Sequence, residues 1–201
     1  MAFDVASPRL SAAPERPVDV SSGAEPPYAA QILAGAVPVD PATFKDALAR
    51  LASGVAIVSC WDGAPTLKGR SARGLLVSSI TGLSVDPPRF LFCVRREASS
   101  HDALLEAGVC GLSILGARDE PEARRFASSD LAHERFTDPR WDLAREDAPW
   151  LRAGLISAIC VIDQTIDAGG HTIVLVSAAQ IVSRSGTPLV AYDRALRSLS
   201  S

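Results

Sequence analysis

This sequence predicts a mainly β fold, an antiparallel barrel with short α-helices between its strands. Apolar runs of strand length recur along the chain, and the longest cover residues 155–166 and 171–183. Segments with helical spacing are short and lie between these runs. Strands and helices do not alternate regularly through the chain, which argues against a doubly wound parallel sheet.

The N-terminal part has a different composition from the rest. Seven of the 14 prolines fall within the first 41 positions, where no helical or alternating period is visible. Pro8, Pro14 and Pro17 also interrupt the apolar core that a secretory signal needs. We expect residues 1–38 to be a disordered extension rich in Pro, Ala and Ser, and residues 39–201 to form one domain.

The first expected element is a helix that starts at Asp40-Pro41, since Asp is a good N-cap and Pro is tolerated at the first helical position. Apolar residues follow at helical spacing up to a terminating glycine: Phe44, Leu48, Leu51, Ala52 and Gly54. Two more short helices are expected, one capped by Ser99 or Ser100 and closed by Gly108, the other over residues 119–127.

The other segments read as strands, turns and one long loop. The predicted strands cover residues 55–61, 74–84, 89–94, 109–115, 155–166, 171–183 and 189–192. Turn chemistry marks residues 62–65 and 167–170. Residues 128–150 look irregular, and three aromatic residues are expected to pin this loop: Phe136, Trp141 and Trp150.

Composition excludes several classes of protein. With a net charge of −3 and scattered basic residues, the chain lacks the footprint of a nucleic-acid binder. Its longest apolar stretch, near residues 153–162, is shorter than the ~20 residues of a membrane-spanning helix. The cysteines stand singly within apolar runs, which predicts buried free thiols in a cytoplasmic protein and no metal site: Cys60, Cys93, Cys110 and Cys160.

Motifs for side-chain catalysis are missing. The chain has no G-x-S-x-G, H-E-x-x-H, P-loop or Rossmann G-x-G-x-x-G pattern, and only three histidines. A protein so poor in candidate nucleophiles and bases is more plausible if a cofactor performs the chemistry.

Residues 74–84 offer a place for a flat polar ligand. An extended strand presents backbone N–H and C=O groups in a row, and the short side chains of Ser78 and Ser79 allow close approach. Gly74 would let the chain bend toward the ligand. The alternative is an ordinary barrel strand with hydroxyls facing solvent.

Two other segments carry candidate binding residues. Ser99-Ser100-His101 opens a helix, whose N-terminus suits phosphate, and Arg95 and Arg96 precede it. The alternative there is plain helix capping, and Arg124-Arg125-Phe126 likewise reads as a helix end or as an edge of the phosphate site. His171 follows two glycines at the head of a strand, where it could contact a nicotinamide nucleotide or simply face solvent.

Together these segments resemble the flavin reductase-like, FMN-binding split-barrel family. The matching segments, in order along the chain, are Leu51–Val55, Gly74–Pro88, Ser99–His101, Arg124–Ala127, Gly169–Thr172 and Pro188–Tyr192. The resemblance covers residues 41–196 and implies a homodimeric antiparallel split barrel that binds FMN or FAD between its subunits. It also implies hydride transfer from NADH or NADPH to the flavin, with a monooxygenase component as possible partner.

The resemblance implies site residues as well. Those expected near the flavin ring and its phosphate are Leu76, Val77, Ser78, Ser79, Ser84, Arg95, Ser99, Ser100, His101 and Phe126. His171 is expected to contact the nicotinamide nucleotide, and no side chain acts as a proton-transfer catalyst. Leu76, Gly170 and Leu196 replace residues that are polar in the family, which keeps open the hypothesis of a non-catalytic flavin-binding module. A further hypothesis is a reductase that retains its flavin and reduces a bound substrate such as a corrin cobalt centre.

Overall fold

The computed structural model describes residues 34–63 and 69–199. The predicted disorder of residues 1–33 and the turn residues Ala64 and Pro65 lie outside these ranges. The chain divides into two compact units, Met1–Pro41 and Ala42–Ser201. The described part of the first unit is exposed, and residues 36–40 in it have no regular structure.

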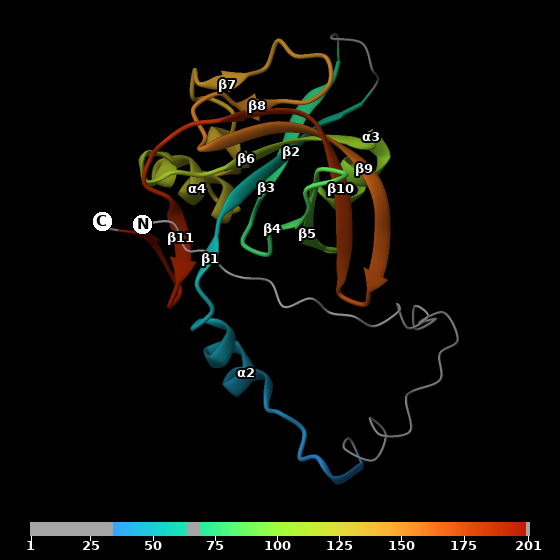
Figure 1. Cartoon of the computed structure of the whole chain (residues 1–201), viewed down its shortest axis with the longest axis vertical. Helices are drawn as coiled ribbons and strands as arrows, with labels where there is room; N and C mark the ends of the chain where they lie inside the picture. Colours follow the sequence, from blue (N-terminus) through green and yellow to red (C-terminus); the bar gives the residue numbers. More distant parts are fainter. Residues whose placement is uncertain (1–33, 64–68, 200–201) are drawn as a thin grey trace, which may run out of the picture. The chain divides into compact units, whose positions relative to one another are not determined.

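Seven strands form the main sheet of the second unit. They are β2 (Ala56–Asp62), β3 (Ser71–Val77), β4 (Thr81–Ser84), β5 (Arg89–Arg95), β6 (Val109–Ile114), β9 (Ile156–Ala168) and β10 (His171–Ser183). Their order is β3-β2-β6-β9-β10-β5-β4, and every neighbouring pair is antiparallel (Figure 1). The predicted mainly β, antiparallel fold is confirmed.

The prediction of one strand over residues 74–84 was wrong. β3 and β4 follow each other in the chain but lie at opposite edges of the sheet, and Ser78–Ile80 connects them outside both ladders. The Ser79 hydroxyl accepts a hydrogen bond from Cys93 N–H (2.8 Å) and donates one to the Cys93 carbonyl (3.2 Å), which holds the connection against β5. The apolar run is continuous in the sequence because both strands need it, although the strands pair with different partners.

The core has two parts because β2 is buried on both faces. Successive strand residues point to opposite sides. Ala56, Val58 and Cys60 belong to one cluster together with residues of β5, β6, β9 and β10. Val55 and Ile57 belong to a second cluster, which also contains Phe126, Trp141 and Leu189.

α2 (Pro41–Leu48) precedes the first strand, and two further short helices lie between strands: α3 (His101–Ala107) and α4 (Glu120–Ala127). Ser100 stands at the N-cap position of α3, although its hydroxyl makes no capping hydrogen bond. The helix ends at Gly108 with φ 65°, a conformation that glycine adopts without strain. Asp119 is the N-cap of α4. α2 is shorter than predicted, ending before Leu51, and has no buried residue.

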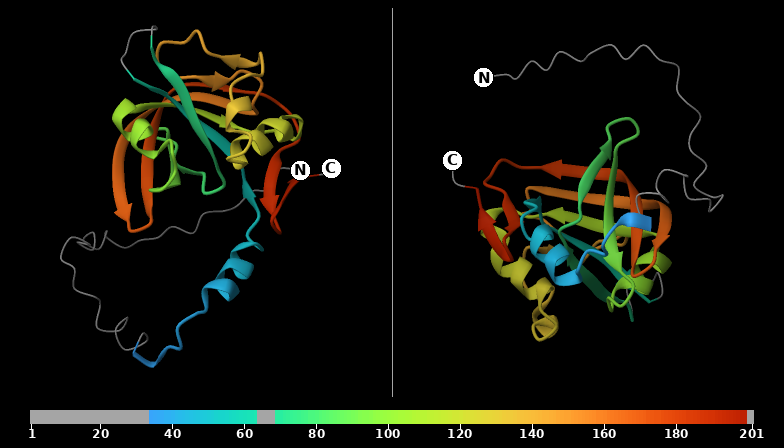
Figure 2. Two further views of the ribbon diagram at one scale, coloured as in Figure 1. Left: turned by 180° about the vertical axis from the view of Figure 1, so that it is seen from behind. Right: turned by 90° about the horizontal axis from the view of Figure 1, so that it is seen from below.

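Two small sheets complete the fold. β1 (Ser53–Gly54), β11 (Leu189–Tyr192) and β12 (Ala195–Ser198) form one, and β7 (Trp141–Asp142) pairs with β8 (Trp150–Leu151) in the other. Figure 2 shows the β11–β12 hairpin and α4 on the same side of the main sheet. The sequence did not predict β12, because Asp193 and Arg194 turn the chain at φ 48° and 60° without the glycine or asparagine that usually marks such a turn.

All four cysteines are free, and Cys60, Cys110 and Cys160 are buried, as predicted, whereas Cys93 is half-buried. Among residues 34–63 and 69–199, no helix has the length and apolar character needed to cross a membrane.

Candidate functional site: a cleft where the sheet opens

A cleft of about 1020 Å³ lies over the opening between β3 and β5. The two strands are not neighbours in the ladder order, yet β3 and its continuation line the cleft through Gly74–Ser79, and β5 lines it through Cys93 and Arg95. The remaining walls come from α2, the start of α3, the end of α4, the β11–β12 hairpin and His171. The cleft therefore lies beside β3, one of the two edge strands of the main sheet.

Gly74 permits close packing beneath the cleft. A Cβ atom at this position would lie 2.9 Å from both the Phe126 ring and the Val58 carbonyl oxygen, and 3.0 Å from the Phe136 ring. Phe126 and Phe136 meet edge to face with their ring centroids 5.0 Å apart. The glycine is thus explained by these contacts and not by the bend expected from the sequence.

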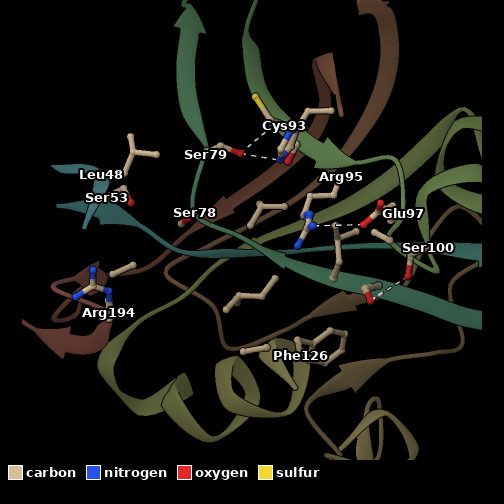
Figure 3. A pocket seen from close by; sticks show the side chains of 18 of the residues that line it. Leu48, Ser53, Ser78, Ser79, Cys93, Arg95, Glu97, Ser100, Phe126 and Arg194 are labelled. Atoms are coloured by element: carbon tan, nitrogen blue, oxygen red, sulfur yellow. Dashed lines mark hydrogen bonds and ion pairs between the residues drawn. The ribbon is translucent and has the colours of Figure 1, made fainter. Parts of the chain in front are cut away.

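The run Leu76–Ser79 offers mostly backbone to the cleft. Val77 is buried in the core and the Ser79 hydroxyl is bound to Cys93, so neither side chain projects freely. Ser78 is exposed and lies at the cleft (Figure 3). Because Ser78–Ile80 belongs to neither ladder, the backbone groups of this connection are not committed to sheet pairing.

Arg95, Ser99 and Ser100 also line the cleft. The buried Ser100 hydroxyl donates to the Gly74 carbonyl at 3.1 Å, which ties the start of α3 to β3. Arg95 pairs with Glu97 at 3.4 Å, and its side chain is 70% exposed (Figure 3). Much of the Arg95 charge is therefore met by Glu97 and by water.

The structure places two predicted residues outside the cleft. The buried ring of His101 has Nε2 2.9 Å from Thr172 Oγ1 and Nδ1 2.7 Å from Asp102 Oδ1. The contact with Thr172 joins α3 to β10, and the contact with Asp102 lies within α3. The Ser84 hydroxyl donates to the carbonyl of Pro87 and so closes the turn after β4. Both residues hold the fold around the cleft.

The other arginines that the sequence suggested are paired elsewhere. Arg96 binds Asp167 at 2.8 Å, and neither residue lines the cleft. Arg124 pairs with Glu120, and Arg125 pairs with Glu122 and Glu134. These ion pairs agree with the first alternative for this segment, an ordinary helix end.

His171 lies at the cleft on the first residue of β10, directly across from Arg95 in the ladder. Arg96 fixes the preceding turn, because its N–H donates to the Gly170 carbonyl (3.1 Å) and its side chain binds Asp167 (2.8 Å). Asp167 also accepts from Gly169 N–H at 2.9 Å. A carboxylate three residues before Gly170 thus stabilises the turn that carries His171.

Several cleft residues were not predicted from the sequence. They are Lys45, Leu48 and Ser53 near the N-terminal edge of the unit, Arg135 beyond α4, and Asp193 and Arg194 at the tip of the β11–β12 hairpin. Figure 3 shows Leu48, Ser53 and Arg194 at one end of the cleft and Ser100 and Phe126 at the other. Ser53 lies in the matching segment Leu51–Val55, whereas the other residues come from segments without a binding motif. Only the fold brings them together.

A sequence profile described as "Flavin reductase like domain" matches residues 48–200, three quarters of the chain. The chain belongs to the flavin reductase-like family. This confirms the family that the sequence resembles, and the matched range includes every strand of the main sheet.

Relatives of this flavin reductase-like chain carry concordant names. An FMN reductase (NADH) RutF 1 from Methylorubrum extorquens is 35% identical over 152 residues, which cover 75% of this chain and 72% of the relative. An NADH-dependent flavin reductase from Rhodococcus sp. is 33% identical over 165 residues, 80% of this chain and 88% of that one.

Solved structures share the flavin reductase-like fold. BorF, the flavin reductase component of a bacterial two-component tryptophan halogenase, is 28% identical with a TM-score of 0.67, covering 81% of this chain and 99% of BorF. The NADH:FAD oxidoreductase SgcE6 from Streptomyces globisporus, solved with NAD and FAD fragments, is 25% identical with a TM-score of 0.70, covering 82% of this chain and 98% of SgcE6.

Proposed function

We propose that this protein is an NAD(P)H-dependent flavin reductase, an oxidoreductase that transfers hydride to FMN or FAD in the cleft between β3 and β5. The observation that carries the assignment of the site is the cleft itself, which lies beside Leu76–Ser79, where the sequence predicted the flavin ring. The names of the relatives agree with the predicted activity and with NADH as the electron donor.

The residues of the cleft fit a flavin. Its volume of about 1020 Å³ is at the upper end of ordinary ligand sites. Leu76 and Phe126 give it apolar walls for a planar ring, and backbone groups of Ser78–Ile80 lie outside the ladders, free to pair with ring heteroatoms. Cationic side chains at the cleft suit the phosphate of a flavin nucleotide: Lys45, Arg95, Arg135 and Arg194.

The chain's contribution to the reaction is positioning. Bound flavin supplies the hydride acceptor, its N5 atom. The residues around it hold two flat rings in contact and exclude water, and alignment of reacting atoms at ~3–3.5 Å removes much of the entropic barrier. No side chain needs to move a proton for this step, in keeping with the lack of a base among Leu76–Ser79. His171 on the rim contacts the nicotinamide nucleotide.

The protein is proposed to act as a cytoplasmic homodimer with the flavin bound between subunits. α2 has no buried residue, and Phe44 is exposed beside Leu48 and Leu51, which line the cleft. A second copy that covers this apolar edge would also close the cleft. Four free cysteines agree with a reducing compartment.

Reduced flavin is proposed to leave the cleft for a partner monooxygenase. BorF is named as the reductase component of a two-component system, which supports this fate of the product. Retention of flavin through gel filtration would instead favour a reductase that uses its flavin in place.

The experiment that tests the function is NADH oxidation by the purified protein with and without excess FMN. NADH consumption should depend on the flavin and exceed the protein-free control. Absence of flavin-dependent consumption would contradict the enzymatic proposal, and quenching of flavin fluorescence without NADH oxidation would identify a binding module.

A variant pair tests the site. Ser78→Trp places a large ring in the cleft and should abolish quenching of FMN fluorescence. Ser71→Trp changes an exposed residue at the start of β3, outside the cleft, and should leave FMN binding intact. Equal binding by both variants would place the flavin elsewhere.

A further inference from the structure

Arg135 is held rigidly at the edge of the cleft by four backbone carbonyls. Its Nε donates to Arg125 (3.2 Å), Nη2 to Ser128 (2.9 Å) and Phe126 (3.5 Å), and Nη1 to Gly74 (3.3 Å). Three of these carbonyls belong to the C-terminal end of α4 and the residue after it. A guanidinium has five N–H donors, so one on Nη1 is left.

The charge of Arg135 has no carboxylate partner. Across residues 34–63 and 69–199, no Asp or Glu lies within ion-pair distance of its guanidinium, whereas Arg95 pairs with Glu97 and Arg194 with Asp46. Burial lowers the pKa of Arg135 below the ordinary arginine value, although the group remains protonated at neutral pH. A desolvated cation without a counter-charge favours the binding of an anion.

Arg135 and Ser100 lie at the same end of the cleft. Both donate to the Gly74 carbonyl, Ser100 at 3.1 Å and Arg135 at 3.3 Å. Arg194 lies at the opposite end in Figure 3. Arg135 is thus the fixed positive charge next to the serines of the segment before α3.

We infer that Arg135, and not the exposed Arg95, supplies the charge that binds a phosphate group of the ligand. This inference rests on the assignment of the cleft as the flavin site. An exposed and paired arginine contributes little, because water and its partner screen it. A pre-oriented, partly desolvated guanidinium binds phosphate strongly without an entropic cost for ordering its side chain. The phosphate belongs either to the flavin nucleotide or to the pyrophosphate of NADH.

Dissociation constants for FMN and riboflavin, measured by flavin fluorescence quenching, test the flavin source. The two ligands differ only in the phosphate. Arg135→Gln should weaken FMN about ten- to a hundredfold, the effect of losing a hydrogen bond to a charged group, and riboflavin by less than about threefold. Arg135→Lys keeps the charge but loses the fork, so it should weaken FMN less than Arg135→Gln does.

A second arm tests the nucleotide source. If the phosphate is that of NADH, Arg135→Gln leaves the ratio of the dissociation constants for FMN and riboflavin unchanged. It then raises the KM for NADH by about tenfold or more relative to the KM for dihydronicotinamide riboside, which has no phosphate. Arg197→Gln, which removes an exposed charge on β12 outside the cleft, is the matched control and should change neither ratio.

Three results overturn the inference. If Arg135→Gln lost the same affinity for FMN and riboflavin and left the ratio of the KM values for NADH and dihydronicotinamide riboside unchanged, Arg135 would only cap the end of α4. Unchanged binding in both arms would exclude Arg135 from the site, and a larger FMN-selective loss in Arg95→Gln would return the role to Arg95. If Arg135→Gln does not fold, as judged by its thermal transition, Arg135→Lys decides by the same ratios. If the wild-type protein binds neither FMN nor riboflavin, the assignment of the cleft as the flavin site is refuted. This outcome is distinct from a failure of the role inferred for Arg135.

Discussion

Cys93 differs from the other three cysteines in its surroundings. It lies half-buried on β5 and lines the cleft, whereas Cys60, Cys110 and Cys160 are buried in the core. Burial, reinforced by Asp62, raises the pKa of the Cys60 thiol from 9.0 to about 12. At pH 8 only about one Cys60 thiol in ten thousand is therefore ionised, and the thiolate is the reactive form.

Thiol modification should consequently report on the cleft. With a thiol reagent at pH 8, Cys93 should react promptly in the native protein and the other three only after unfolding in guanidinium chloride. FMN should slow the reaction of Cys93, since it covers that wall. Cys93→Ser should remove the fast phase. A fast phase that FMN leaves unchanged would contradict flavin binding against β5.

His171 gives a second prediction. It lies at the rim of the cleft on a turn fixed by the Arg96–Asp167 ion pair. His171→Ala should raise the KM for the nicotinamide nucleotide more than the KM for flavin, because the side chain is proposed to contact only the former. Steady-state kinetics with each substrate varied in turn would measure both constants. Unchanged nucleotide kinetics would reject this role.

Residues at the cleft were predictable where a motif marked them. Ser99, Ser100 and Phe126 were expected near the ligand and do line the cleft. Arg135 was not, since it stands in a segment without periodicity and acquires its surroundings from α4 and β3. His101 belongs to a matching segment, but its ring turns into the protein toward Thr172, which a sequence motif does not reveal.

At the scale of elements, α4 is joined to the segment after it through a buried carboxylate. Glu122 has no exposed surface and accepts a hydrogen bond from Trp141 Nε1 at 3.0 Å. Arg125, one turn along α4, is the second partner of Glu122. The pKa of Arg125 is raised, chiefly by its hydrogen bond to Glu122. The link matters because α4 carries Phe126 to the cleft.

Trp141→Phe should therefore destabilise the protein. It leaves one oxygen of a buried carboxylate without a donor, at a cost of about 1–3 kcal/mol. Trp150→Phe is the matched control: in the described part of the chain, Trp150 Nε1 is buried and has no hydrogen-bond partner, so its loss removes no bond. Guanidinium denaturation should give a clearly larger loss for Trp141→Phe. Equal losses of unfolding free energy in the two variants would show that the hydrogen bond from the Trp141 indole to Glu122 does not stabilise the fold.

Elements were predictable in proportion to their length and periodicity. The 13-residue strands β9 and β10 and the turn between them match the sequence prediction to within two residues at each end. β3 and β4 were merged, because a change of strand partner at Ser78–Ile80 leaves no gap in the apolar pattern. α2 was overextended, since apolar residues at helical spacing continue to Leu51 beyond the end of the helix.

At the scale of the whole molecule, the second unit leaves apolar side chains on α2 and just after it exposed. Phe44, Leu48 and Leu51 are 55%, 51% and 66% exposed. A helix of eight residues is not stable in water by itself, and here none of its residues is buried. The proposed second copy would supply the missing packing and place Leu48 inside a shared site.

Sedimentation equilibrium should accordingly give the mass of two chains for the full-length protein. The variant Phe44→Glu puts a charge on this apolar edge at a residue that does not line the cleft, and it should sediment as a monomer. Because the cleft lies beside α2, this monomer should also bind FMN at least about tenfold more weakly, the equivalent of 1.4 kcal/mol. Leu143→Glu changes another exposed apolar residue, in the segment between β7 and β8, and should leave both mass and affinity unaltered. A dimer that survives Phe44→Glu would show that the subunits meet elsewhere, and a monomeric wild-type protein with full flavin affinity would show that one chain completes the site.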